Sequence, residues 1–212
     1  SRSTKLVHGG VRYLQQGNIT LVRDALRERT LLRANAPHLV HDLPFVIPCR
    51  SWWQRFFYGV GLKVYDFLAV GNSFGRSRNL SAAETMKAVP ALNRNQIKGG
   101  VLYHDGQFDD ARLLISMART GHDAGACLLN YMRVTSLIRD QDQRVSGVAA
   151  RDAESGDEFS IKGRAVINAT GPFSDAIRSM DDAKQETMIA SSQGVHLVLP
   201  RALYPGDTAI IV

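Results

Sequence analysis

The chain has 212 residues, which is enough for one large domain or two small ones with a sizeable buried core. Hydrophobic residues make up 44% and charged residues 22% of it, so the composition excludes a disordered chain and a repeat array. The net charge of +6 favours an anionic partner, and because the basic residues are dispersed we expect phosphorylated small molecules or a lipid surface, not nucleic acid.

The cysteines and the hydropathy pattern restrict the chain further. Cys49 and Cys127 form neither a redox pair nor a metal-ligand cluster, so we expect reduced thiols, a cytoplasmic setting and no metal site. No apolar run approaches the roughly 20 residues that a membrane-spanning helix needs, and no signal peptide is recognisable. We therefore expect no transmembrane segment.

Two helices are predicted from their capping residues and apolar spacing. Asn18 is a suitable N-cap for a helix that ends before Pro37. Its apolar face consists of Ile19, Val22, Ala25 and Leu26. Asp109 and Asp110 favour the start of a second helix, since carboxylates are stabilised at the positive end of the helix dipole, and we expect Gly121 to end it. The apolar face of this second helix consists of Ala111, Leu114, Ile115 and Ala118.

Residues 45–68 combine aromatic and basic side chains. The aromatic members are Trp52, Trp53, Phe56, Phe57 and Tyr58, and the basic ones are Arg50, Arg55 and Lys63. Such a mixture suits a membrane interface as well as a buried core, and both interpretations stay open. Gly59-Val60-Gly61 lacks the third glycine and the preceding buried strand of a dinucleotide-binding turn, so we interpret it as a chance match.

The second half of the chain is rich in predicted strands. Residues 127–167 read as several strands joined by polar turns at 140–144 and 154–157, which predicts a β-meander. Residues 165–167 then form a short apolar strand before a Gly-Pro turn and a helical pattern over 173–180. A glycine at the end of such a strand lets the backbone approach a dinucleotide closely, although an ordinary strand-to-helix turn has the same pattern.

Residues 3–13 gather hydroxyls, a lysine, a histidine, two adjacent glycines and an arginine. The hydroxyls of Ser3 and Thr4, with nearby backbone N–H groups, can hold a pyrophosphate, and Arg12 offers a planar fork for a phosphate or carboxylate. The alternative is a polar turn leading into a helix, which composition alone favours.

Several segments together resemble the flavin-dependent glycerol-3-phosphate dehydrogenases. They are residues 3–13 (STKLVHGGVRY), residues 105–113 (DGQFDDARL) and residues 168–172 (NATGP). Gly194-Val195-His196 follows, before an expected strand over residues 197–201 that ends in Pro-Arg. The resemblance covers essentially the whole chain in the order that this family shows.

The resemblance implies an α/β (α+β) fold. A substrate-binding or cap region with a mixed or antiparallel sheet accompanies part of a Rossmann-like FAD-binding domain. We accordingly expect a partial FAD-binding segment with a helix in residues 1–30 and a substrate or cap region with helices in residues 31–125. Residues 126–180 would supply the β-meander and a strand, turn and helix of the FAD domain, and residues 181–212 the start of the substrate-binding sheet.

The resemblance also implies a reaction. In this family FAD accepts a hydride from C2 of sn-glycerol 3-phosphate, dihydroxyacetone phosphate forms, and a membrane quinone or oxygen takes the electrons. By resemblance Arg12 and Tyr13 line the substrate site and His196 lies near the reacting hydroxyl. Imidazole suits acid–base work near neutral pH, but a histidine that only orients the substrate is equally compatible. The expected FAD contacts are Ser3, Thr4, Lys5, His8 and Gly9 on one side and Ala169, Thr170 and Gly171 on another.

Other polar residues receive structural interpretations. We expect His104 and His122 to be surface or packing residues, and Asp109, Asp110 and Arg112 to cap a helix and form salt bridges.

Members of this family are peripheral membrane proteins, so we expect association with an anionic membrane surface, at the inner face of the cell membrane. The turn Gly-x-Gly-x-x-Gly that anchors flavin pyrophosphate has no match, and residues 209–212 read as the start of a buried strand. We therefore expect an interior piece of a longer enzyme that is inactive alone, and whose exposed apolar face favours association, including a homo-oligomer.

Two alternatives stay open. One is another FAD-dependent oxidoreductase that acts on amines or hydroxy acids. The other is a non-enzymatic module that binds membrane surfaces through residues 50–57.

Overall fold

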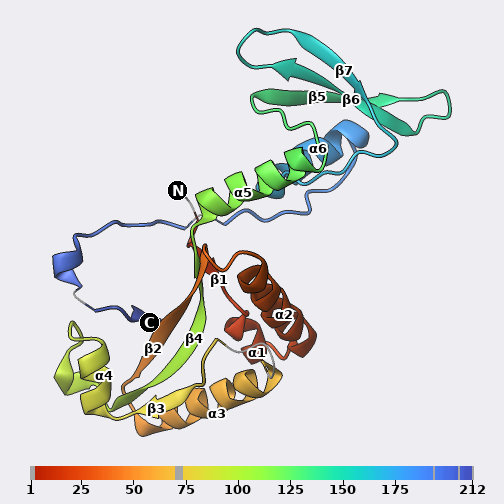
Figure 1. Cartoon of the computed structure of the whole chain (residues 1–212). Helices are drawn as coiled ribbons and strands as arrows, with labels where there is room; N and C mark the ends of the chain where they lie inside the picture. Colours follow the sequence, from red (N-terminus) through yellow and green to blue (C-terminus); the bar gives the residue numbers. More distant parts are fainter. Residues whose placement is uncertain (1–2, 70–73, 193, 205, 212) are drawn as a thin grey trace. The chain divides into compact units, whose positions relative to one another are not determined.

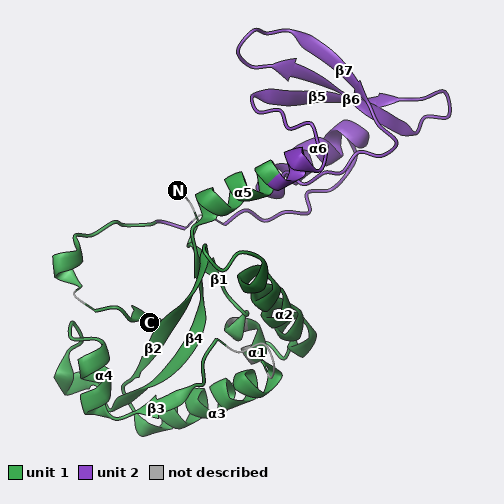
Figure 2. Cartoon of the chain, in the orientation of Figure 1, with its two compact units in different colours: residues 1–119, 196–212 green, residues 120–195 purple. Residues whose placement is uncertain are grey.

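A computed structural model describes residues 3–69, 74–192, 194–204 and 206–211, without the side chains of Arg12 and Gln15. The chain divides into two compact units (Figure 2). Unit 1 contains residues 1–119 and 196–212, and unit 2 contains residues 120–195. The functional assignment of the four segments expected from the sequence stays a prediction.

Unit 1 is built on a five-stranded mixed sheet in the order β1-β4-β2-β8, with β3 also paired to β4 (Figure 1). The strands are β1 (Leu6–Val7), β2 (Val40–Cys49), β3 (Arg78–Leu80), β4 (Gly99–Phe108) and β8 (Ala209–Ile210). The helices are α1 (Val11–Gln15), α2 (Ile19–Asn35), α3 (Trp52–Leu68), α4 (Ala82–Ala88) and the start of α5 (Asp110–Asp123), with short 3₁₀ helices at Arg94–Gln96 and Arg201–Leu203. β8 runs parallel to β2 and the other pairs are antiparallel, which confirms the predicted mixed sheet and α/β class.

Side-chain alternation along β2 and β4 assigns residues to the two faces of the sheet. Phe45 and Tyr103 lie opposite each other and stack, with ring centroids 5.3 Å apart, in the core cluster that includes residues of α2 and α3. The neighbouring residue Val46 points the other way and packs near α4. Figure 1 shows α1, α2 and α3 gathered on one side of these strands. Asp105 has the same parity as Tyr103 and therefore points toward the same helices.

Helix α2 begins as the sequence predicts. Asn18 Oδ1 accepts the backbone N–H of Leu21 at 3.2 Å, and Val22 and Leu26 are fully buried. Arg29 lies on the same stripe, two helical turns after Val22, and is 1% exposed. The buried face of this helix therefore carries a cation.

Helix α5 also begins as predicted but ends later. Asp109 Oδ1 accepts the backbone N–H of Arg112 at 3.1 Å, yet the helix continues through Gly121, so the predicted end is wrong. A glycine inside a helix costs only about 1 kcal/mol relative to alanine, which a continuing helix tolerates. The left-handed backbone after the helix is instead adopted by Gly125, with φ 89°. The exposed apolar side chains of α5 include Leu114, Ile115 and Met117.

Unit 2 contains the predicted meander. Its antiparallel strands are β5 (Met132–Arg139), β6 (Val145–Asp152) and β7 (Glu158–Lys162), followed by a 3₁₀ helix at Gly171–Phe173 and by α6 (Ser174–Asp181). The predicted strands at residues 165–167 and 197–201 are absent from the described chain, so these two expectations are wrong. A strand needs a neighbour to complete its backbone hydrogen bonds and cover its side chains, and here Ile167 is 87% and Val198 97% exposed.

Candidate functional site

A pocket of about 450 Å³ in unit 1 is lined by some of the polar side chains predicted near the N-terminus. Its polar lining consists of Thr4, His8, Tyr13, Gln16 and Asp105. Phe45 and Tyr103 contribute the aromatic part of the wall. The pocket thus combines hydroxyl, imidazole, carboxamide and carboxyl groups with an apolar surface.

Two glycines connect β1 to α1 at the wall of this pocket. Gly10 has φ 73°, a left-handed backbone that favours glycine, and its carbonyl accepts the N–H of Tyr13 at 2.8 Å as α1 begins. Gly9 is buried, and a Cβ there would lie 2.1 Å from Tyr65 Oη and 2.6 Å from Leu26 Cδ2. The backbone of this turn therefore rests directly on α2 and α3.

A buried polar cluster lies next to the turn. Arg29 Nη1 donates to Asp105 Oδ1 at 2.7 Å and to Tyr65 Oη at 3.3 Å. The side chains of Arg29 and Asp105 are 1% and 3% exposed, and the Arg29 guanidinium carbon lies 4.4 Å from the centroid of the Phe74 ring. Asp105 Oδ1 also accepts the N–H groups of Gly9 at 3.1 Å and of its own neighbour Gly106 at 3.0 Å.

Burial sets the protonation properties of this cluster. It raises the pKa of Asp105 above the ordinary value, against the hydrogen bonds and the positive charge of Arg29, which lower it. Burial, reinforced by the charge of Asp105, likewise raises the pKa of Tyr65. Tyr65 is therefore a neutral hydroxyl at physiological pH.

The structure brings only some of the predicted site residues together. Thr4, His8 and Tyr13 line the pocket and Gly9 adjoins it. Ser3 Oγ accepts the backbone N–H of Lys5 at 3.0 Å. The Lys5 ammonium lies 4.0 Å from the carboxylate of Asp110, outside the described lining. The roles of these residues stay predictions.

The two remaining substrate-site candidates are placed less completely. Arg12 belongs to α1, but its side chain lies outside the described part of the structure. His196 is exposed in a segment without regular secondary structure and is not among the described residues that line the pocket. The assignments of Arg12 and His196 therefore stay predictions too.

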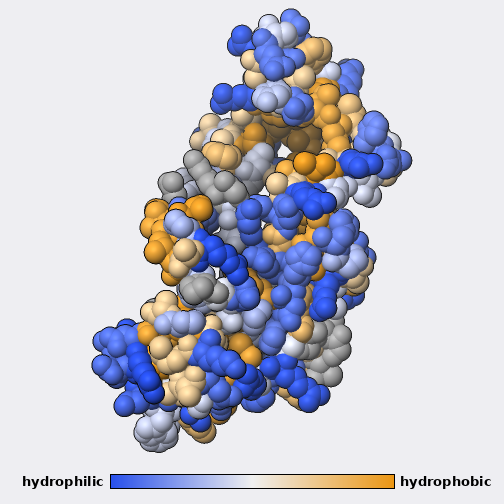
Figure 3. Space-filling view, turned by 60° about the vertical axis from the view of Figure 1, so that its left-hand side comes forward, coloured by the Kyte–Doolittle hydropathy of each residue, from blue (hydrophilic) through white to orange (hydrophobic). Residues whose placement is uncertain are grey.

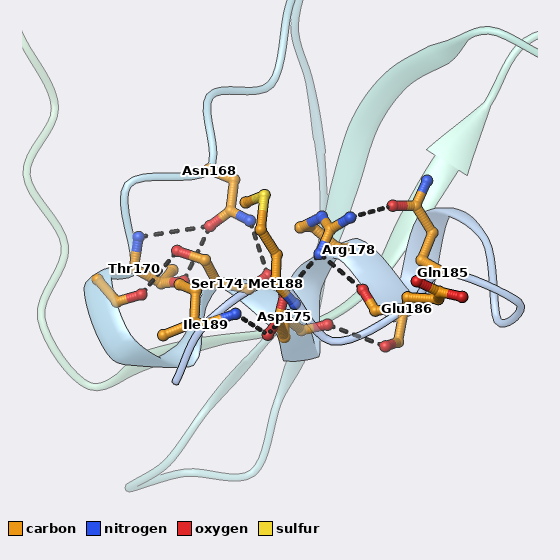
Figure 4. A network of polar contacts seen from close by, with 11 residues as sticks. Asn168, Thr170, Ser174, Asp175, Arg178, Gln185, Glu186, Met188 and Ile189 are labelled. Atoms are coloured by element: carbon orange, nitrogen blue, oxygen red, sulfur yellow. Dashed lines mark hydrogen bonds and ion pairs between the residues drawn. The ribbon is translucent and has the colours of Figure 1, made fainter. Parts of the chain in front are cut away.

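In unit 2, the turn containing Ala169, Thr170 and Gly171 is held by its own hydrogen bonds (Figure 4). Asn168 Oδ1 accepts the Thr170 hydroxyl at 2.8 Å, and its amide donates to the Ser174 carbonyl at 2.9 Å. Gly171 has φ 57°, which favours glycine there. The assignment of this turn to the FAD site stays a prediction.

A second network follows the turn. Asp175 Oδ2 accepts the N–H groups of Ile189 at 2.9 Å and of Met188 at 3.0 Å, and its other oxygen pairs with Arg178 at 2.6 Å (Figure 4). These contacts, led by the Ile189 amide, lower the pKa of Asp175. They tie α6 to the chain that follows it.

Helix α3 presents an aromatic face to solvent. We define this aromatic face as Trp52, Trp53, Phe56, Phe57 and Phe67, which are 56–76% exposed. On the opposite side of the helix, Leu62 and Tyr65 are buried in the core. The face borders an apolar groove of about 710 Å³ that shares Val11, Gln16 and Ile211 with the lining of the polar pocket. No helix among the described residues is long and apolar enough to cross a membrane.

Apolar side chains reach the surface elsewhere as well, as the orange areas in Figure 3 show for one side of the molecule. The aromatic face of α3 is distinguished by its bulky rings and by Arg50, which is exposed beside it.

Sequence reasoning missed the buried cluster although two signals were available. Arg29 shares the helical stripe of Val22 and Leu26, and Asp105 shares the strand parity of Tyr103. Both patterns place a charged residue at a core position, where it needs an oppositely charged partner.

Comparison with known proteins gives consistent results. The model of the family described as FAD dependent oxidoreductase matches residues 1–211. The mitochondrial glycerol-3-phosphate dehydrogenases of Homo sapiens and Arabidopsis thaliana are 41% and 43% identical to the whole chain, which spans 31% and 36% of their lengths.

Two solved structures of oxidoreductases are also similar to the chain. The glycerol-3-phosphate dehydrogenase from Bacillus halodurans, complexed with FAD, is 31% identical with a TM-score of 0.61, over 86% of this chain and 28% of that one. L-Proline dehydrogenase from P. horikoshii has the same TM-score at 18% identity, over 78% of this chain and 42% of that one, which shows a shared fold only.

Proposed function

The chain belongs to the family of FAD-dependent oxidoreductases, and from this premise we propose that it serves a glycerol-3-phosphate dehydrogenase. The reaction is oxidation of glycerol 3-phosphate at C2 to dihydroxyacetone phosphate, with FAD as hydride acceptor and a quinone or oxygen as final acceptor. The observation that carries this proposal is the 41–43% identity over the whole chain to proteins of that name. The clustering of Thr4, His8 and Tyr13 around one pocket supports it.

The pocket in unit 1 suits one portion of FAD. Gly10 lies in the lining without a side chain, Thr4 and His8 offer polar contacts, and the stacked pair of Phe45 and Tyr103 offers an apolar wall. When bound, FAD supplies the hydride acceptor that amino-acid side chains lack.

The residues of this chain then bind the substrate and move its proton. Arg12 and Tyr13 bind the anionic oxygens of the substrate, for which a guanidinium fork is well suited. His196 takes the proton of the C2 hydroxyl as the hydride leaves. Both assignments follow from the family resemblance.

The substrate is tested by anaerobic reduction of the flavin-loaded full-length enzyme that contains this chain. Glycerol 3-phosphate should bleach the visible flavin band, whereas glycine, proline and 2-hydroxy acids at equal concentration should not. Bleaching by an amino acid or a hydroxy acid in preference to glycerol 3-phosphate would instead identify another oxidoreductase of the same fold.

Replacement of His196 by Ala in the full-length enzyme should lower kcat by about 100-fold or more while the flavin content per protein stays unchanged, because general acid–base catalysis contributes at least this much. Steady-state kinetics normalised to the flavin absorbance measures the effect. The matched control is His122→Ala, since His122 is an exposed histidine on α5 with no assigned role. Turnover near the unmodified value in the His196 variant would exclude an acid–base role.

We also propose that the aromatic face of α3 rests on an anionic membrane surface. Its exposed rings suit the interfacial region of a bilayer, and Arg50 together with the net charge of +6 favours acidic lipids. The adjacent apolar groove shares lining residues with the polar pocket, so it offers an apolar acceptor such as a quinone a path toward the flavin. This arrangement gives the protein a peripheral position on a membrane.

The combined substitution Trp52→Ala and Trp53→Ala should weaken binding to vesicles containing acidic phospholipid by at least about tenfold, since each large apolar side chain contributes over 1 kcal/mol when buried. Co-sedimentation at moderate salt measures this affinity. Leu114→Ala with Met117→Ala, on exposed α5, is the matched control. Unchanged vesicle binding would contradict membrane docking. Loss of a concentration-dependent dimer in the Trp variant would point to a second copy of the chain as the occupant.

A further inference from the structure

We infer that Asp105, held by Arg29, is a positioning residue that fixes the turn at Gly9 and Gly10 in the wall of the pocket. The placement of the turn follows from the packing alone. Only its consequence for turnover rests on the proposed function.

One carboxylate oxygen joins three parts of unit 1. Asp105 Oδ1 on β4 accepts the N–H of Gly9 in the turn at 3.1 Å and Arg29 Nη1 of α2 at 2.7 Å. The same Arg29 nitrogen donates to Tyr65 Oη of α3. The hydrogen bond that holds the turn is therefore connected to a strand and two helices.

The turn is restrained from two sides. Asp105 attracts the Gly9 amide, and a hydrogen bond to a buried, charged acceptor is stronger than one between neutral groups. On the other side Tyr65 and Leu26 leave no room for even a methyl group at Gly9, so the turn cannot sink further into the core.

Helix α1 begins directly after the turn, so the position of the turn also sets the position of α1 at the pocket wall. The carbonyl of Gly10 accepts the N–H of Tyr13 at 2.8 Å, at the first turn of this helix. His8 lies just before the two glycines and Tyr13 just after them, and both line the pocket. The position of the turn therefore sets the positions of these two side chains. Arg29 makes the arrangement possible, because a buried carboxylate without a cation is strongly unfavourable.

Hydrogen exchange at the Gly9 amide tests the inference directly. Asp105→Asn keeps an oxygen but loses the charge, and Asp105→Leu with Arg29→Met removes both charged groups. We expect exchange at Gly9 to become roughly tenfold faster in the first variant and faster still in the second, the range expected for losing a hydrogen bond to a charged group. Asp42→Asn is the matched control, because Asp42 lies on the neighbouring strand β2 and its carboxylate pairs with His104 of β4.

The double variant Asp105→Leu with Arg29→Met distinguishes positioning of the turn by Asp105 from a role in stability alone. Its melting temperature should exceed that of Arg29→Met alone, because replacing both members of a buried ion pair by apolar groups avoids an unpaired charge. Gly9 should nevertheless remain unprotected, and kcat/KM per bound flavin, measured in the full-length enzyme, should remain low. Normal protection of Gly9 in the double variant, or full turnover once stability returns, would overturn the inference. The exchange measurement decides the matter whether or not glycerol 3-phosphate is the substrate.

Discussion

Replacement of Gly9 by Ala is expected to destabilise the protein by about 1–3 kcal/mol, the usual cost of overpacking a core. The added Cβ would lie 2.1 Å from Tyr65 Oη and 2.6 Å from Leu26 Cδ2, distances at which atoms must shift. The backbone of Gly9 is not left-handed, so the effect comes from this contact. Urea unfolding of both proteins measures the loss.

Two further variants isolate the cause. Gly61→Ala makes the same chemical change inside α3 where nothing lies within 4 Å, and it should stabilise the helix by about 0.5–1 kcal/mol. Tyr65→Phe removes the nearest atom, so Gly9→Ala should cost less stability when it is added to Tyr65→Phe than when it is added to the unmodified protein. Equal stabilities of Gly9→Ala and the unmodified protein would show that the turn does not rest on α3 as described.

Replacement of Arg29 by Met should cost about 3–5 kcal/mol at neutral pH, because it leaves the carboxylate of Asp105 buried without its cation. Arg78→Met is the matched control, since it breaks an ion pair with Glu84 whose side chains are 57% and 49% exposed. Exposed pairs contribute little, so the control should lose far less. Similar losses in both variants would contradict a dominant role of the buried pair.

The loss in Arg29→Met should also depend on pH. Burial raises the folded-state pKa of Asp105 above its unfolded value. Replacing Arg29 removes a hydrogen bond and a positive charge that lower this pKa. A group with a raised folded pKa stabilises the fold below the unfolded pKa, and this contribution is lost as pH rises through the folded pKa. The difference between Arg29→Met and the unmodified protein should therefore be smaller at pH 4 than at pH 7. A pH-independent difference would mean that the charge of Asp105 is not the cause.

Local features of the structure could be predicted well. Asn18 and Asp109 mark helix starts because a cap acts on backbone groups within one turn. The meander in residues 127–167 was predictable because alternating strands and polar turns are adjacent in the chain. The strand predicted at residues 165–167 is absent. A strand requires a hydrogen-bonded neighbour, and the apolar run does not specify one.

The candidate site was predictable in part. The resemblance of residues 3–13 to a flavoenzyme family indicated Thr4, His8 and Tyr13, which line one pocket. The same residues gave no indication of how their turn is held. The aromatic stretch was equally ambiguous, because α3 has apolar residues on two sides and only packing decided that Tyr65 is buried and Trp52 exposed.

The sequence by itself determined the family, the starts of α2 and α5, and three polar residues of the pocket, because each of these depends on a contiguous segment of the chain. Only the tertiary structure decided that Arg29 meets Asp105, which is 76 residues away in the chain. That contact depends on the register between β2 and β4 and on how α2 packs against them. A charged residue at a core position indicates that it needs an oppositely charged partner, but only the fold determines which residue that partner is.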